Sequence, residues 1–294
     1  MTRGVWSVIC YVLATVLAAP PASAHGVAGK RFFPATLTIY DPFVADELSL
    51  VSLSHIKGSE GKETSIGAEL AKTITPDLGI SVGAEYVLVD PSDPAEGSHS
   101  GFGNPDLGVR YKFFQSDEHE TVLSVGLSWN IGRVGKSSVG AESFSTLSPA
   151  LLFGKGLGDL PDAVGFLRPL AVTGTVGADV PLNKEAPNVL AYGVAIEYSL
   201  PYLQTHVRDV GLPSFFAKLI PLVELQWQTP LDGPDKRTTG TVNPGVIWAG
   251  KSFEVGVEAI IPMTSHSGKN VGVRALLHFF LDDIWPAVFR PIFN

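Results

Sequence analysis

The chain has 294 residues, of which 45% are hydrophobic and 17% charged, and its mean hydropathy is +0.22. This composition excludes an intrinsically disordered protein, which needs low hydrophobicity and high charge. It also departs from ordinary soluble domains, in which about 25% of residues are charged. With 31 glycines, the chain favours strands and tight turns over helices.

Residues 1–24 have the pattern of an export signal. Arg3 gives a positive start, residues 8–19 an apolar stretch, and residues 22–24 a small-residue cleavage site. We therefore expect a mature chain that begins at His25. An uncleaved membrane anchor is the alternative, although the apolar stretch is shorter than the roughly 20 residues that a helical span needs.

The mature chain would carry 20 basic and 29 acidic residues, a net charge of −9, which argues against a nucleic-acid partner. Cys10 is the only cysteine and lies in the signal, so no disulfide or thiol chemistry is expected. No later stretch is apolar enough for a transmembrane helix. If the mature chain crosses a membrane, it must therefore do so as a closed β-barrel.

Apolar and polar residues alternate through the mature chain, as they do in strands whose two faces meet different surroundings. Within 78–89, Ile80 and Val82 share one face, while Ser81 and Glu85 share the other. Most of the expected strands approach the roughly 9 to 11 residues that cross a bilayer at a tilt. The pattern predicts twelve strands, at 47–56, 64–75, 78–89, 105–114, 120–131, 146–155, 167–181, 189–200, 216–228, 239–249, 252–262 and 270–281.

An even number of strands places both ends of the barrel on one side, which we expect to be periplasmic. The long connection at 201–215 is expected to carry a short helix, and Pro221 makes 216–228 one of the two weakest strands, together with 146–155. The tight turns are 75–77 and 249–251, and the external loops are 90–104, 132–145, 229–238 and 263–269. The predicted parts are a signal (1–24), a periplasmic N-terminal segment (25–46), an outer-membrane barrel (47–281) and a periplasmic tail (282–294).

The apolar face of the strands has aromatic residues near the strand ends, as the interfacial girdles of membrane barrels do. We expect this face to contact lipid; a soluble barrel or sandwich with an apolar core is the alternative. The charged face, including Lys218, then lines the lumen with a net charge of −4, which favours cations unless ion pairs close the interior. The predicted lumen-lining residues are Glu69, Glu85, Asp106, Arg110, Lys112, Asp179, Glu197, Glu224, Glu254, Glu258 and Arg274.

Five segments carry a family resemblance: RFFPATLTIYDPFVADELSL (31–50), GAESFST (140–146), LPYLQTHVRDVGLP (200–213), TTGTVNPGVIWAG (238–250) and HFFLDDIWP (278–286). They look like a group of proteobacterial outer-membrane β-barrel proteins that are similar to the phenol meta-pathway transporter family. The likeness spans the mature chain and implies an outer-membrane barrel with a transport role. Its motifs include no catalytic signature.

The last predicted strand, 270–281, resembles the signal by which the barrel-assembly machinery recognises outer-membrane strands. In most such proteins this strand ends the chain, whereas here an aromatic tail follows, with Trp285, Phe289 and Phe293. We expect the tail to pack at the periplasmic rim.

Three histidines are weighed as chemical groups. His99 lies in a glycine-rich loop and His278 on a polar strand face, where hydrogen bonding is the simpler role. His25 would combine an imidazole with a free α-amino group that can chelate copper, although chance placement is the commoner explanation. No hydrolase, zinc-protease or phosphate-loop motif occurs, so we expect no enzyme, cofactor or metal site.

These observations predict an all-β, closed antiparallel transmembrane barrel of about twelve strands in the bacterial outer membrane. We expect a channel or passive transporter for small molecules; a non-conducting structural or surface-interaction barrel is the alternative. The expected partners are outer-membrane lipid, the barrel-assembly machinery and a small-molecule solute, and not nucleic acid.

Overall fold

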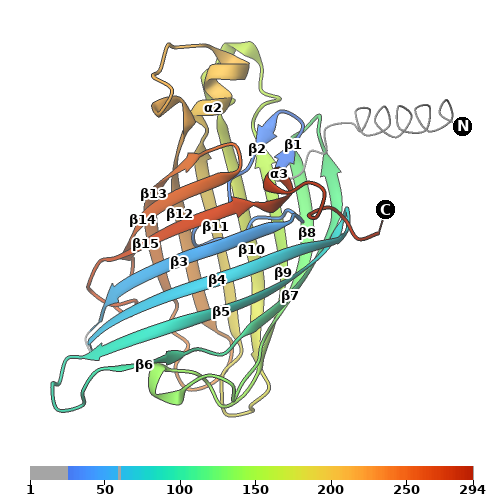
Figure 1. Ribbon diagram of the computed structural model, residues 1–294. Helices are drawn as coiled ribbons and strands as arrows, with labels where there is room; N and C mark the ends of the chain where they lie inside the picture. The colour runs from blue at the N-terminus through green and yellow to red at the C-terminus, as the bar shows by residue number, and fades with distance from the viewer. Residues whose placement is uncertain (1–25, 59–60, 294) are drawn as a thin grey trace, which may run out of the picture.

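Twelve antiparallel strands close into a barrel (Figure 1). The structure is a computed structural model that describes residues 26–58 and 61–293, so the predicted signal and His25 lie outside the described residues. The wall strands are β3 (Glu47–Lys57), β4 (Gly61–Thr75), β5 (Leu78–Pro91), β7 (Asp106–Ser116), β8 (Thr121–Asn130), β9 (Thr146–Gly156), β10 (Leu170–Pro181), β11 (Val189–Tyr198), β12 (Leu219–Pro230), β13 (Thr239–Ala249), β14 (Phe253–Pro262) and β15 (Gly272–Phe280). All twelve predicted strands are confirmed, including the two weakest.

The ring closes between the first and last wall strands, since β3 pairs with β15 as well as with β4. The predicted external loop 90–104 is partly wrong, because it contains a further short strand, β6 (His99–Phe102), which pairs with the far half of β5. β7 pairs only with the near half of β5, from Leu78 to Gly83. The strand beside β5 is thus interrupted at residues 103–105.

The apolar face of the wall points outward. On β14, Val255 and Val257 are 45% and 46% exposed, whereas the flanking residues Glu254 and Glu258 are buried. A period of two sends neighbouring side chains to opposite faces. The predicted orientation, with apolar residues outside and charged residues inside, is therefore confirmed.

The two described chain ends lie at the same end of the barrel, which we call the terminal end (Figure 1). Its short helices are η2 (Asp162–Leu167), α2 (Leu200–Tyr202), η3 (Leu203–Val207), η4 (Phe216–Lys218) and α3 (Leu281–Ile284), which confirms the helix predicted in 201–215. The opposite, loop end carries η1 (Ser137–Val139) and the longer loops. No helix of the described residues has the length and hydropathy needed to span a membrane.

One sequence prediction about the lumen is wrong. Lys218 belongs to η4 at the terminal end and is exposed, with its Nζ 4.9 Å from the centre of the Trp248 ring. Trp248 also contacts Phe253, and both rings lie on the outward face. The prediction fails because β12 begins at Leu219, three residues later than the alternation suggests.

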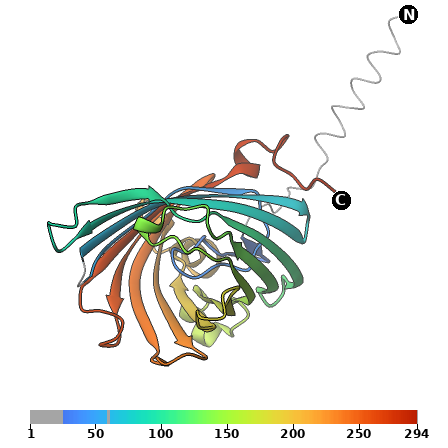
Figure 2. The same ribbon diagram turned by 90° about the horizontal axis from the view of Figure 1, so that it is seen from below.

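Residues 33–46, which we call the inner segment, run inside the ring of strands. They follow a small hairpin, β1 (Val27–Ala28) and β2 (Arg31–Phe32), and lead directly into β3. Figure 2 looks into the barrel from the loop end and shows this blue stretch within the wall. Phe33, Ile39 and Phe43 of the inner segment are buried, so the segment supplies part of the core.

The tail after α3 packs against the terminal end of β4. The backbone N–H of Phe293 donates to the carbonyl of Ile74 at 2.8 Å. Lys72 Nζ donates to the carbonyl of Arg290 at 2.7 Å and to both carboxylate oxygens of Asp46. Lys72 interrupts the apolar outward pattern, and these oxygens satisfy its ammonium group.

Candidate lumen site

One carboxylate of the wall holds three consecutive residues of the inner segment. The backbone N–H groups of Leu37, Thr38 and Ile39 donate to Glu224 with N–O distances of 3.1, 3.0 and 2.7 Å. Glu224 is fully buried on the lumen face of β12. Because the inner segment forms neither a helix nor a strand here, its backbone N–H groups need hydrogen-bond acceptors from elsewhere. The Glu224 carboxylate provides them.

The hydroxyl of Thr38 joins the same segment to three further strands. It donates to Glu258 Oε1 of β14 at 2.6 Å and accepts from Asn243 Nδ2 of β13 at 2.9 Å. Arg274 NH1 of β15 also donates to this hydroxyl and forms an ion pair with Glu258 at 2.7 Å. Thr38 is therefore fixed by hydrogen bonds from several directions.

Two more carboxylates complete this surface. Glu254 Oε2 accepts from the backbone N–H of Ala35 at 3.0 Å, while its Oε1 has no hydrogen-bond partner among the described residues. Glu197, on β11, is 1% exposed, and neither of its oxygens has a hydrogen-bond partner within the part of the chain that the structure describes. We call the following group the seat of the inner segment: Glu197, Glu224, Asn243, Glu254, Glu258 and Arg274.

Beyond the seat, the inner segment crosses to the other side of the lumen. Thr175 of β10 donates to the carbonyl of Tyr40, and Ser124 of β8 donates to that of Pro42. At the end of the segment, Asp46 accepts from the backbone N–H of Thr73 at 2.6 Å. Wall side chains thus hold the backbone of the segment along most of its length.

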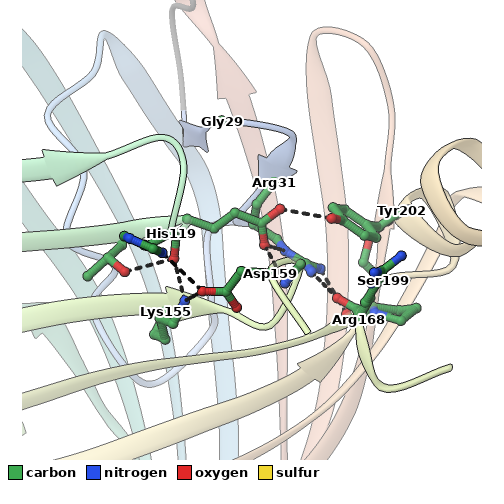
Figure 3. Close-up of polar contacts among 12 residues, drawn as sticks. Gly29, Arg31, His119, Lys155, Asp159, Arg168, Ser199 and Tyr202 are labelled. Carbon is green, nitrogen blue, oxygen red and sulfur yellow. Dashed lines mark hydrogen bonds and ion pairs between the residues drawn. The ribbon is translucent and has the colours of Figure 1, made fainter. Parts of the chain in front are cut away.

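A buried cluster fastens the start of the described chain at the terminal end (Figure 3). Arg31 lies with its guanidinium carbon 3.9 Å from the centre of the Tyr202 ring and its Nε 3.2 Å from Glu120 Oε2. It also donates to the carbonyls of Pro169, at 2.8 Å, and Arg168. Arg31 therefore ties the hairpin to the loop before β10 and to α2.

Glu120 shares its carboxylate between two further donors. Tyr202 Oη donates to Glu120 Oε1 at 2.9 Å, and the N–H of Gly158 donates to Oε2 at 3.1 Å. Burial, followed by the hydrogen bond to Glu120, raises the pKa of Tyr202 to about 12. Beside this cluster, the hydrogen bond from Lys155 lowers the pKa of Asp159 (Figure 3).

A cavity of about 430 Å³ lies between the inner segment and the wall formed mainly by β3 to β9. Glu69, Glu85 and Asp106 line it, and none of these carboxylates forms an ion pair with any described residue. Arg110 also lines it, but its NH1 donates to the carbonyl of Phe43 at 2.8 Å and lies 3.8 Å from Asp41 Oδ1. The cavity thus presents more negative than positive groups to a solute.

The structure divides the predicted lumen residues into three sets. Glu69, Glu85, Asp106 and Arg110 line the cavity, whereas Glu197, Glu224, Glu254, Glu258 and Arg274 belong to the seat. Lys112 lies 3.3 Å from Asp77 at the terminal end, and Asp179 accepts from Ser148 at 2.6 Å.

Arg31 and Asp46 are not among the residues predicted from the sequence, although each fixes the course of the N-terminal residues. One signal was available: residues 31–46 combine charged, aromatic and proline residues without strand alternation. Such a stretch needs partners outside itself.

Two of the histidines weighed for chemistry, His99 and His278, lie within the described residues. His99 is in β6 at the loop end, whereas His278 is buried on the lumen face of β15. His278 Nδ1 lies 3.0 Å from Ser49 Oγ, in line with the expected hydrogen-bonding role. Among the described residues, no three His, Cys, Asp or Glu side chains gather closely enough to hold a metal ion.

Comparison with known proteins gives matches of structure only. No family model matches the sequence, and no curated protein matches it. The COG4313 outer membrane channel from Pseudomonas putida F1 is 11% identical, with a TM-score of 0.57 over 89% of this chain and 99% of that one. The KdgM porin has a TM-score of 0.46 at 12% identity, over 78% of this chain and 97% of that one.

LpxR from Salmonella typhimurium has a TM-score of 0.44 at 10% identity, over 80% of this chain and 99% of that one. At these identities the likeness concerns the fold, and at the two lower TM-scores it is only general. The chain therefore shares the fold of outer-membrane β-barrel proteins.

Proposed function

We propose that this protein is a passive outer-membrane channel for small solutes, related to the barrels that resemble the phenol meta-pathway transporters. Residues 1–24 direct export, the barrel-assembly machinery inserts the chain, and the apolar outer face contacts lipid. The terminal end faces the periplasm and the loop end faces outward. The tail and the hairpin with its cluster then lie on the periplasmic side.

The cavity beside the inner segment is the observation that carries this proposal. It leaves about 430 Å³ of space within a wall that otherwise packs against the inner segment. A small solute fits such a space, and carboxylates along a pore favour cations over anions. We therefore propose a cation preference set by Glu69, Glu85 and Asp106, with Arg110 engaged by the inner segment.

Bilayer recording tests this proposal. The purified protein should give discrete conductance, and a salt gradient should give a reversal potential that reports cation preference. Glu85→Gln combined with Asp106→Asn should shift that potential toward zero. Glu185→Gln, on an exposed loop, is the control and should not shift it.

The course of the inner segment favours a second candidate, the non-conducting barrel. Wall side chains hold its backbone from Ala35 to Phe43, and several of these contacts are buried. If correctly folded protein gives silent bilayers, and loosening the segment by Glu224→Gln leaves them silent, the channel proposal is wrong. A structural or surface-interaction role would then explain the barrel.

A further inference from the structure

The seat places four carboxyl groups beside a single cation of its own, Arg274. Of the carboxylates of Glu197, Glu224, Glu254 and Glu258, only Glu258 has an ion-pair partner among the described residues, which is Arg274. All four are at most 2% exposed. Burying a carboxylate without a cation costs free energy, and backbone N–H groups offset it only in part.

The inner segment, which occupies the seat, presents a row of hydrogen-bond donors to it. Four N–H groups within residues 35–39 point to Glu224 and Glu254, and the Thr38 hydroxyl points to Glu258. Among residues 26–58 and 61–293, no hydrogen-bond partner is found for Glu254 Oε1, Glu258 Oε2 or either carboxyl oxygen of Glu197, although these side chains are buried. The seat therefore accepts hydrogen bonds from several donors in a row, and its remaining carboxyl oxygens could accept further ones.

Apolar groups lie between these carboxylates. Leu37 of the inner segment packs against the buried cluster of Ile220, Leu222 and Ile247, which face the lumen on β12 and β13. A ligand that fits the seat must therefore alternate donors with short hydrocarbon spacers. A free peptide matches this pattern without charge, whereas a linear polyamine matches it with positive charge at each donor.

We propose that the seat is a binding site for linear polyamines, which displace residues 35–39. Hydrogen bonds between ammonium groups and carboxylates are about twice as strong as those of neutral donors. The methylene spacers replace Leu37 on the apolar cluster. The cavity, lined by Glu69, Glu85 and Asp106, also borders residues 35–41 and is the route by which a cation would reach the segment.

The resident segment sets the concentration at which this exchange occurs. A covalently tethered segment competes at an effective concentration on the order of millimolar or above. The polyamine must therefore act in the millimolar range. The part of this inference that concerns opening of the lumen rests on the proposed channel function, whereas binding does not.

Thiol accessibility of the mature protein in detergent provides a direct test. Ile39 is 4% exposed, and the mature chain has no native cysteine, so an Ile39→Cys variant reports release of the segment through its reaction with a maleimide. Because the reaction follows the open population, millimolar spermidine should accelerate it roughly tenfold. Sodium chloride at equal ionic strength and an uncharged triethylene glycol should not.

Seat variants locate the effect. Glu254→Gln in the Ile39→Cys background should raise the spermidine concentration needed to accelerate the maleimide reaction. The substitution removes one carboxylate, while the glutamine oxygen can still accept from the backbone N–H of Ala35. Glu118→Gln, on an exposed loop, should leave it unchanged. Calorimetry of spermidine with the unaltered mature protein gives a second readout that needs no cysteine, in case Ile39→Cys prevents folding.

The outcomes separate this inference from the proposed function. Unchanged maleimide reactivity of the Ile39→Cys variant, together with no heat of binding, contradicts the polyamine site. A conducting channel that spermidine binds but leaves unaffected contradicts the opening of the lumen by spermidine, while the site and the channel proposal stand. Spermidine binding with bilayers that stay silent supports the site and contradicts the channel.

Discussion

The guanidinium of Arg31 and the carboxylate of Glu120 form a buried ion pair, with side chains 0% and 5% exposed and an Nε–Oε2 distance of 3.2 Å. The pair joins the hairpin before the inner segment to the turn between β7 and β8. Removing one partner of a buried pair leaves the other charged and unpaired, which costs about 3–5 kcal/mol.

Arg31→Ala should therefore free the N-terminal residues from the terminal end. Limited proteolysis followed by mass spectrometry should show faster cleavage within residues 26–46 while the wall stays intact. Arg31→Lys should be nearly as harmful, because lysine cannot reproduce the planar fork that bonds Glu120 and the carbonyls of Arg168 and Pro169.

Arg237→Ala is the control for this prediction. Arg237 pairs with Asp235 on the surface, with side chains 61% and 55% exposed, and such pairs are worth about 0–1 kcal/mol. Equal cleavage of the Arg31 and Arg237 variants would contradict an anchoring role for the buried pair.

Tyr202 should remain protonated at unusually high pH. Its pKa is raised to about 12 in the fold, against 10.0 for a free tyrosine, first by burial and then by donation to Glu120. The raised value means that the neutral form stabilises the fold below pH 10. This stabilisation is lost as the pH rises from about 10 to about 12.

An alkaline absorbance titration checks this point. The difference between the wild type and Tyr202→Phe should show one phenol ionising near pH 12. Tyr202→Phe should also lower stability at neutral pH by about 1.5–3 kcal/mol, because a hydrogen bond to a charged group is lost. Ionisation of Tyr202 near pH 10 would show that the bond to Glu120 is not maintained.

A charge on the outer face should damage the protein in a bilayer. Val257 is 46% exposed near the middle of β14. Val257→Arg should lower the free energy of unfolding in lipid vesicles by about 2–4 kcal/mol, the cost of arginine near a bilayer midplane. Val210→Arg, at an exposed residue of the terminal end, is the control and should have little effect. Equal stability of both variants would contradict lipid contact at β14.

Deleting residues 286–294 should cost stability without preventing barrel formation. The deletion removes the bonds from Lys72 to Arg290 and from Phe293 to Ile74. At about 0.5–1.5 kcal/mol for each hydrogen bond, we expect a loss of about 1–3 kcal/mol in denaturant unfolding. Ile292→Ser, which alters an exposed residue of the same tail, should leave stability unchanged. A barrel that does not form at all would point to a role of the tail in assembly.

The wall could be predicted from sequence because each strand carries its own pattern. In β14, outward valines alternate with inward glycine and glutamate, and this local rule fixes both the strand and its faces. β6 was missed because four residues cannot display a period of two against a glycine-rich background.

The inner segment could not be predicted in the same way. Its residues have no period, and their partners are remote: Ile39 and Glu224 lie 185 residues apart, and Thr38 and Arg274 lie 236 apart. The alternation of apolar and polar residues places Glu224 and Glu85 on the lumen face equally well. Only the fold shows that the chain covers Glu224 while Glu85 lines the cavity.

The pairing of β3 with β15 imposes an order of events on assembly. This last seam can form only when residue 280 has been synthesised, whereas residues 33–46 are made first and join β3 at Glu47. The inner segment, already joined to β3, can be enclosed as the two sheet edges meet around it. A barrel that closed before residues 33–46 lay inside it would leave the glutamates of β12 and β14 without these hydrogen-bond donors.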